Sequence, residues 1–154
     1  MSYSVNPWTF YANFAAARAI GKDIVSSQFN FSADDLAYIS RHWIHLDHDQ
    51  TYTASAGASY RWEQTRISAD MVSQSGLRAS TDVPNGTSLS HYVTVNLGLT
   101  QGLELPALGD IKLRFDVINL LDKEYEIRNG TGVGVGAPQF GARRGFFGGI
   151  TKAF

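Results

Sequence analysis

The chain has 154 residues with 13 basic side chains, 14 acidic side chains and no cysteine. Its formal net charge of −1 leaves no basic excess to hold a phosphate backbone, so we expect no nucleic-acid partner. The lack of cysteine excludes disulfides, thiolate metal ligands and cysteine nucleophiles. A transmembrane helix is excluded as well, because no run of about 18 apolar residues is present.

Alternation of apolar and polar residues with period two recurs in six segments, which predicts six β-strands. In chain order the segments are 8–17, 51–62, 66–71, 92–99, 111–117 and 144–154. Most can be read as about 9–11 residues, the length with which a tilted strand crosses a bilayer, whereas soluble strands have a mode of about 5–6. The pattern therefore favours an all-β, antiparallel transmembrane barrel segment. Its apolar faces would contact acyl chains.

The predicted connections alternate in length. They are 21–50 (long), 63–64 (short), 73–90 (long), 101–109 (moderate) and 122–143 (long). Outer-membrane barrels have short periplasmic turns and longer extracellular loops, and this chain fits if its first strand runs outward. The aromatic residues near the periplasmic interface are then Trp8, Tyr60, Trp62 and Phe154. Tyr52 lies near the outer interface, so aromatic rings gather at both membrane surfaces.

Two alternatives remain open. A soluble antiparallel sandwich or small barrel explains the alternation equally well, with the apolar faces as its interior. It explains less easily why charged side chains occupy the opposite faces while long and short loops alternate. Separately, Ile24–Phe31 and Asp35–Leu46 are candidate further strands, which would raise the number of strands from six to eight.

The C-terminal region carries more specific motifs. The stretch LRFDVINLLDKEYEIRNG, followed by GVGVGAPQFGARRGFFGGITKAF, closely resembles the end of TonB-dependent receptors. The recognisable parts are Asn119-Leu120-Leu121-Asp122, Tyr125, an Arg-Arg-Gly entry and an aromatic C-terminus. Upstream, DHDQTYTASAGASYRW and Ser75–Arg78 also look like this family. The likeness covers essentially the whole chain, and about the last 60 residues are the most diagnostic part.

The resemblance implies a location in the outer membrane of a Gram-negative bacterium and a part in the uptake of a scarce ligand, such as a siderophore or metal chelate. Receptors of this kind are barrels of about 22 strands around an N-terminal plug domain. Residues 1–154 match the last strands, with no counterpart of the plug or the TonB-contacting box. We therefore expect neither transport by this chain alone nor enzymatic activity. MSYSVNPWTF has no signal-peptide pattern, so we expect an export signal upstream or a truncated chain.

Six strands are too few to close a barrel, since single-chain bacterial barrels begin at about eight. Open edges leave backbone groups unpaired in lipid, which costs several kcal/mol per group. The expected partners are outer-membrane lipid, the barrel-assembly machinery, and either the missing strands and plug or further copies of the chain. The alternative function is a small closed or oligomeric outer-membrane barrel with a structural or binding role.

The densest group of potential metal ligands is His42, His45 and His48, with Asp47 and Asp49 between and after them. Imidazoles and carboxylates suit zinc and similar divalent ions. A spacing of three does not place all three histidines on one face of a strand. We therefore interpret the group as a polar rim, with metal binding as the weaker alternative, and predict no resident metal or cofactor.

Two further groups of residues have predicted roles. Lys112, Arg114 and Asp116 share one strand face, which we interpret as the polar wall of a barrel lumen. The resemblance implies that the terminal aromatic Phe154 is part of the signal read by the barrel-assembly machinery. Ile150 and Phe146 share its face and extend that predicted signal.

Overall fold

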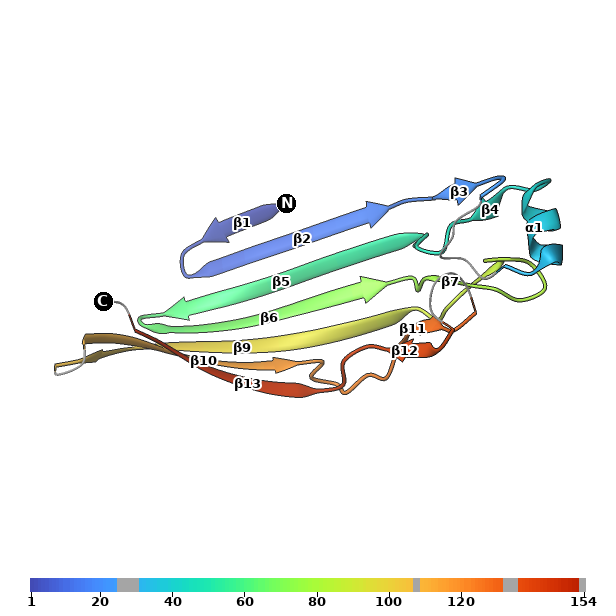
Figure 1. Cartoon of the computed structure of the whole chain (residues 1–154). Coiled ribbons are helices and arrows are strands. Elements are labelled where there is room, and N and C mark those ends of the chain that lie inside the picture. The colour runs from blue at the N-terminus through green and yellow to red at the C-terminus, as the bar shows by residue number, and fades with distance from the viewer. Residues whose placement is uncertain (25–30, 107–108, 132–135, 153–154) are drawn as a thin grey trace.

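The computed structural model describes residues 1–24, 31–106, 109–131 and 136–152. Its main feature is one seven-stranded antiparallel sheet with the order β1-β2-β5-β6-β9-β10-β13 (Figure 1). The strands are β1 (Ser2–Val5), β2 (Trp8–Ala16), β5 (Tyr52–Trp62), β6 (Thr65–Gln74), β9 (Tyr92–Leu105), β10 (Gly109–Ile118) and β13 (Gly145–Lys152). Neighbouring strands follow one another in the sequence except for the small elements between them, so the sheet is an up-and-down meander.

The six predicted strands are confirmed as β2, β5, β6, β9, β10 and β13. The structure adds a seventh, β1, which pairs with the first half of β2 from Ser2↔Tyr11 to Val5↔Trp8. The sequence prediction missed β1 because four residues are too few for alternation to stand out. The predicted number of six, or eight with the two candidate strands, is therefore wrong by one in either case.

The candidate strand Asp35–Leu46 is wrong, because its first part is the helix α1 (Ala33–Ile39). Ser32 caps this helix: its Oγ accepts the backbone N–H of Asp35, and the Asp35 carboxylate accepts the backbone N–H of Ser32. This reciprocal capping box starts a helix and competes with an extended conformation. The other candidate strand, Ile24–Phe31, lies outside the described residues except for its two ends. Within the described part of the chain, no helix is long and apolar enough to cross a membrane.

The short connections lie at one end of the sheet and the long connections at the other (Figure 1). At one end β5 and β6 are joined by the predicted two-residue turn. The 101–109 connection is shorter than predicted, because β9 continues to Leu105 and β10 begins at Gly109. At the other end are the three long connections, 17–51, 75–91 and 119–144, which we call the loop cluster.

The loop cluster contains α1 and three small hairpins. Their strands are β3 (Ile20–Gly21) with β4 (Ile44–His45), β7 (Arg78–Ala79) with β8 (Thr87–Ser88), and β11 (Glu126–Asn129) with β12 (Pro138–Phe140). Most of the fully buried side chains lie in this cluster rather than in the sheet, including Ile39, Ile44 and Ala79. The small core of the molecule is therefore at the loop end.

The register of the sheet places most of its apolar residues on one face. One cross-strand row runs through every strand and consists of Tyr3, Phe10, Ala58, Ala69, Leu97, Val117 and Phe146. Because side chains alternate between faces, a slip of one residue in any pair would turn that strand's apolar residues to the other side. The pairing of seven strands thus builds a single continuous apolar surface, which we call the apolar face.

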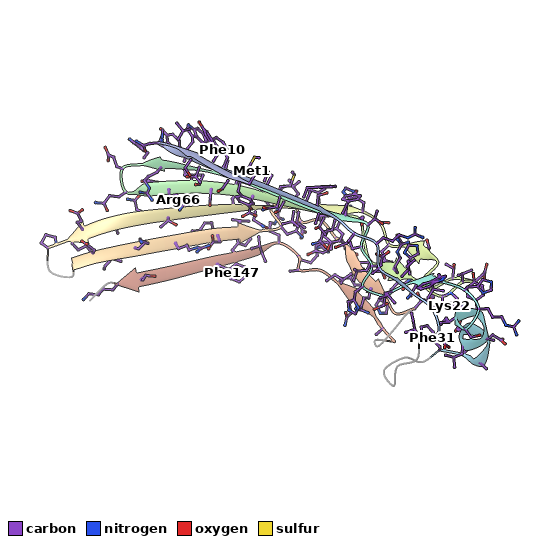
Figure 2. All side chains as sticks on the ribbon, turned by 90° about the horizontal axis from the view of Figure 1, so that it is seen from above. Met1, Phe10, Lys22, Phe31, Arg66 and Phe147 are labelled. Carbon is purple, nitrogen blue, oxygen red and sulfur yellow. The ribbon has the colours of Figure 1, made fainter. Side chains whose placement is uncertain are left out.

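No second layer covers the apolar face among the described residues, and the sheet is a single layer in Figure 2. Phe14 is 72% exposed, Phe115 47% and Ile150 76%. The described strands therefore do not form the soluble sandwich in which this face would be an interior. They also do not close into a barrel: β1 and β13 are the two free edges of an open sheet.

Gly57 is a position where the packing on the polar face of the sheet leaves no room for a side chain. The ring of Tyr11, its cross-strand partner, lies so close that a Cβ on Gly57 would be 2.4 Å from Tyr11 Cε1. We expect Gly57→Ala to lower the free energy of unfolding in detergent micelles by about 1–3 kcal/mol, measured by urea denaturation. Gly148→Ala is the control, because a Cβ there meets nothing within 4 Å. Equal losses in both variants would contradict this packing.

Candidate functional site

Two carboxylates of the first long connection hold the loop cluster together. Asp49 is 2% exposed and accepts hydrogen bonds from Nε and Nη2 of Arg78 at 3.1 and 2.9 Å. Asp47 is also buried and forms an ion pair with Nη1 of Arg128. Arg78 belongs to β7 and Arg128 to β11, so each carboxylate ties a different loop to the first one.

Asp49 is the more densely bonded of the two. Its Oδ1 accepts the backbone N–H of Ala19 at 2.6 Å, and its Oδ2 lies 2.6 Å from Nδ1 of His45. Burial acts to raise the pKa of Asp49, but the hydrogen bonds from Ala19, His45 and Arg78 and the charge of Arg78 outweigh it and lower the pKa below its usual value of 3.8. Asp49 is therefore a charged structural group.

The three histidines of the predicted ligand group turn to separate partners. His42 stacks on the ring of Tyr38, with 4.1 Å between ring centroids, and its Nδ1 is 3.0 Å from the Tyr38 carbonyl oxygen. His45 contacts Asp49, and Nη2 of Arg128 donates to Nε2 of His48 at 2.7 Å. In the described parts of the chain, no three His, Asp or Glu side chains are placed to hold a metal ion. The two aspartates of the group are buried in ion pairs with Arg78 and Arg128, so they do not belong to an exposed polar rim.

Asn119 closes the third long connection at its base. It is 3% exposed and has a φ of 47°, a left-handed conformation that asparagine tolerates better than most residues. Its Nδ2 donates to the carbonyls of Lys123 and Ala142 at 2.8 and 2.9 Å, and its own N–H donates to Oδ1 of Asn96 at 2.8 Å. The side chain of Asn119 therefore joins the start of the connection to its end, and its backbone N–H joins both to β9.

Asp122 provides the second closure of the same connection. Its two oxygens accept from Nε and Nη2 of Arg143 at 2.9 and 2.7 Å, and Oδ1 also accepts the backbone N–H of Arg144. These bonds hold the pKa of Asp122 well below its usual range. The Asn-Leu-Leu-Asp and Arg-Arg motifs, noted in the sequence as a family resemblance, are thus direct partners in space.

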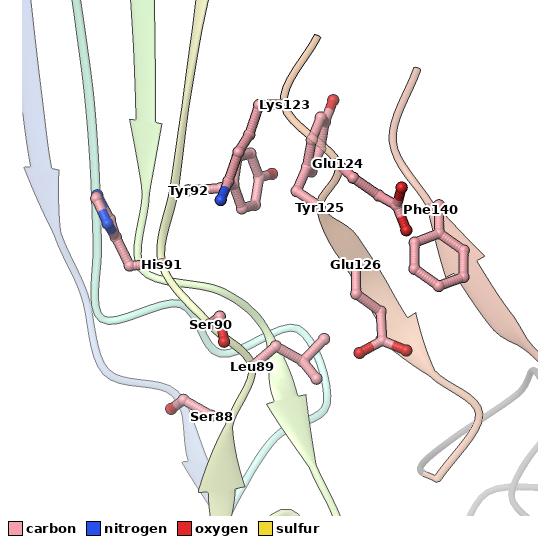
Figure 3. A pocket seen from close by; sticks show the side chains of 10 residues that line it. All are labelled: Ser88, Leu89, Ser90, His91, Tyr92, Lys123, Glu124, Tyr125, Glu126 and Phe140. Carbon is pink, nitrogen blue, oxygen red and sulfur yellow. The ribbon is translucent and has the colours of Figure 1, made fainter. Parts of the chain in front are cut away.

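A groove of about 460 Å³ opens where β9 begins beside the third connection (Figure 3). Its principal lining residues are Tyr92, Lys123, Glu124, Tyr125, Glu126 and Phe140. The rings of Tyr92 and Tyr125 stack with 4.1 Å between centroids. Sequence reasoning missed this groove, because its residues come from separate segments. Aromatic rings beside both acidic and basic groups suit a small ligand with apolar and polar parts.

The predicted interface aromatics lie near both ends of the sheet. Trp8 and Tyr60 contact each other near the short turns, with 4.7 Å between ring centroids, and Trp62 ends β5 at the same turn. Tyr52 begins β5 at the loop end, and its ring centroid is 6.0 Å from that of His91. Their role at membrane surfaces stays a prediction.

The structure describes two of the three residues of the predicted assembly signal. Phe146 and Ile150 lie on the apolar face of β13, opposite Val117 and Leu113, and both are exposed. Phe154 lies outside the described residues. The role of these three residues in membrane assembly therefore stays a prediction too.

The chain matches no protein-family model, no curated protein and no solved structure. The resemblance to TonB-dependent receptors accordingly stays a prediction that rests on the residue motifs. The function has to be argued from the sheet and its loops.

Removing the charge of Asp49 is expected to release the loop cluster. Asp49→Asn leaves the guanidinium of Arg78, whose side chain is 12% exposed, without its charged partner, and breaking such a buried pair costs about 3–5 kcal/mol. The Ala19 amide donates a hydrogen bond to Asp49, so its hydrogen exchange should become faster in the variant. Asp82→Asn, an exposed change in the same cluster, is the control. Unchanged protection of the Ala19 amide in Asp49→Asn would contradict the proposed role of Asp49 in holding the loop cluster together.

The same carboxylate makes stability depend on pH in a defined direction. Because the pKa of Asp49 is lower in the folded than in the unfolded protein, its contribution is fully present above the unfolded value, about 3.9, and is lost as pH falls through the folded pKa. Protection of the Ala19 amide should fall in this acidic range in the wild type. The Asp49→Asn variant should not show this loss of protection at acidic pH. The same pH dependence of Ala19 protection in both proteins would refute the role of Asp49.

Proposed function

We propose that this chain forms part of the wall of an outer-membrane β-barrel of the TonB-dependent receptor kind. The observation that carries the proposal is the continuous apolar face, which seven strands build in register and which nothing covers among the described residues. Monomeric soluble proteins rarely expose contiguous apolar patches beyond a few hundred Å². Acyl chains satisfy such a face without any further protein layer.

Strand length supports the same proposal. The strands β2, β5, β6, β9 and β10 have 9, 11, 10, 14 and 10 residues. A strand of about 10 residues with a rise of about 3.3 Å per residue and a tilt of about 45° spans about 23 Å. This span is close to the apolar band of about 25 Å on outer-membrane barrels.

The distribution of charge is the third support. Charged side chains of the main sheet gather on the opposite, polar face; they are Arg61, Arg66, Asp70, Glu104, Asp110, Lys112, Arg114 and Asp116. Within the described strands, Lys152 is the charged exception on the apolar face, near the turn end, and Phe147 is a large apolar exception on the polar face. This division suits lipid on one side and water on the other.

The free edges define what the proposed barrel needs. In hydrocarbon the unpaired N–H and C=O groups of β1 and β13 each cost several kcal/mol, so further strands must pair with them. In the receptor proposal these strands, and a plug, belong to the rest of a longer barrel. In the alternative, copies of this chain supply them and form an oligomeric barrel. Under either proposal the loop cluster and its groove face outward, where an imported siderophore or metal chelate would arrive.

The three tryptophans provide a direct test. Trp8 and Trp62 lie on the apolar face, whereas Trp43 lies in the loop cluster and is 67% exposed. We expect brominated acyl chains to quench the fluorescence of Trp8 and Trp62 strongly and that of Trp43 weakly. The measurement uses the full chain in vesicles, with single-tryptophan variants in which the other two are changed to Phe.

The control is the same set of variants in vesicles without bromine. Mass measurement of the detergent-solubilised protein distinguishes oligomers of this chain from a segment that needs other strands. Equal quenching of all three tryptophans, or a folded monomer that stays in solution without detergent, would refute the membrane proposal.

A further inference from the structure

Arg61 and Arg66 occupy directly opposite positions in the β5–β6 pair, on the polar face next to the short turn. Like charges in opposite positions destabilise a sheet. A cross-strand row continues from Arg66 through Thr100 to Arg114, but Arg114 is already neutralised by Asp116, with 2.6 Å between Nε and Oδ2. The unexplained charge is therefore the Arg61–Arg66 pair.

Neither arginine has a carboxylate partner in the described parts of the chain. Nη2 of Arg66 donates to the Ser59 hydroxyl at 2.9 Å, and no ion pair joins Arg61 or Arg66 to an acidic group. The neighbouring acid Glu104 accepts a hydrogen bond from Gln64 at 2.7 Å instead. The structure thus places Arg61 and Arg66 side by side, and no described carboxylate balances their charge.

These side chains surround one concavity of about 410 Å³. Its lining includes Arg61, Arg66 and Lys112, with Glu63 as the acidic member. Gly102 also lines it, and its N–H donates to the Gln64 carbonyl at 2.9 Å, so its amide signal reports on this part of the concavity. Three cations against one carboxylate leave a net positive lining.

We propose that this concavity is a binding site for a small water-soluble oxyanion, with phosphate as the chemical class. Two guanidinium groups offer paired N–H donors that match the oxygens of phosphate, and the Lys112 ammonium adds a third cation. The site opens on the polar face, opposite the surface assigned to lipid, which argues against a lipid head group. The choice of a water-soluble anion over a lipid head group rests on the proposed function, which assigns the opposite face to lipid, whereas the anion site itself needs only this polar face.

The test uses inorganic phosphate and the ¹⁵N-labelled full chain in dodecylmaltoside micelles, which contain no phosphate. Phosphate should shift the Gly102 amide and Arg Nε–H signals saturably, whereas chloride at equal ionic strength should not. Arg61→Gln combined with Arg66→Gln should weaken phosphate binding about tenfold or more, because hydrogen bonds between charged groups are lost. Arg41→Gln, an exposed arginine of the loop cluster, is the matched control.

Thermal unfolding gives a second measurement. Phosphate should raise the Tm of the wild type and of Arg41→Gln but not that of the double variant. Without phosphate the double variant should be at least as stable as the wild type, since the opposed like charges are gone. Equal effects of phosphate and chloride on the wild type would overturn the site, whatever the variants do. Unchanged phosphate affinity in the double variant would overturn it as well.

Discussion

The pairing register of the seven-stranded sheet is the constraint on which the other features depend. Each pair from β1 to β13 is aligned so that most side chains meet others of the same character across the strands, with Phe147 and Lys152 of β13 as exceptions. Apolar surface therefore accumulates on one side, while charge accumulates on the other. The sheet has no inner core of its own, and its stability depends on what covers the apolar face and what pairs with its edges. In the proposed membrane setting, lipid would cover the apolar face and additional strands would pair with the edges.

The loop cluster is stabilised in a different way. It has few buried apolar side chains, and its described segments are joined mainly by charge-assisted hydrogen bonds of Asp47, Asp49 and Asp122. The buried pairs of Asp47 and Asp49 are sensitive to the loss of either partner, because the remaining charge has little water to solvate it. The sheet is thus determined by the repeating alternation of apolar and polar residues, whereas the loop cluster is determined by specific polar contacts.

This difference explains how much the sequence could reveal. Alternation predicts β2, β5, β6, β9, β10 and β13, because each strand carries its own repeating signal. It misses the four-residue β1, and it misses α1, whose signal is one capping box at Ser32. The loop contacts were not predictable, since Asp49 meets Arg78 across 29 positions and Asp47 meets Arg128 across 81. The histidine cluster shows the same limit, because His45 contacts Asp49, His48 contacts Arg128 and His42 stacks on Tyr38.

The short hairpin β11–β12 has two attachments. Glu126 lines the groove beside Tyr125, and Arg128, two residues later in the same strand, forms an ion pair with Asp47. Asp47 is separated by one residue from Asp49, which forms an ion pair with Arg78 of β7. The wall of the groove is therefore joined to all three long connections by a single series of contacts, so the shape of the groove depends on residues that do not line it.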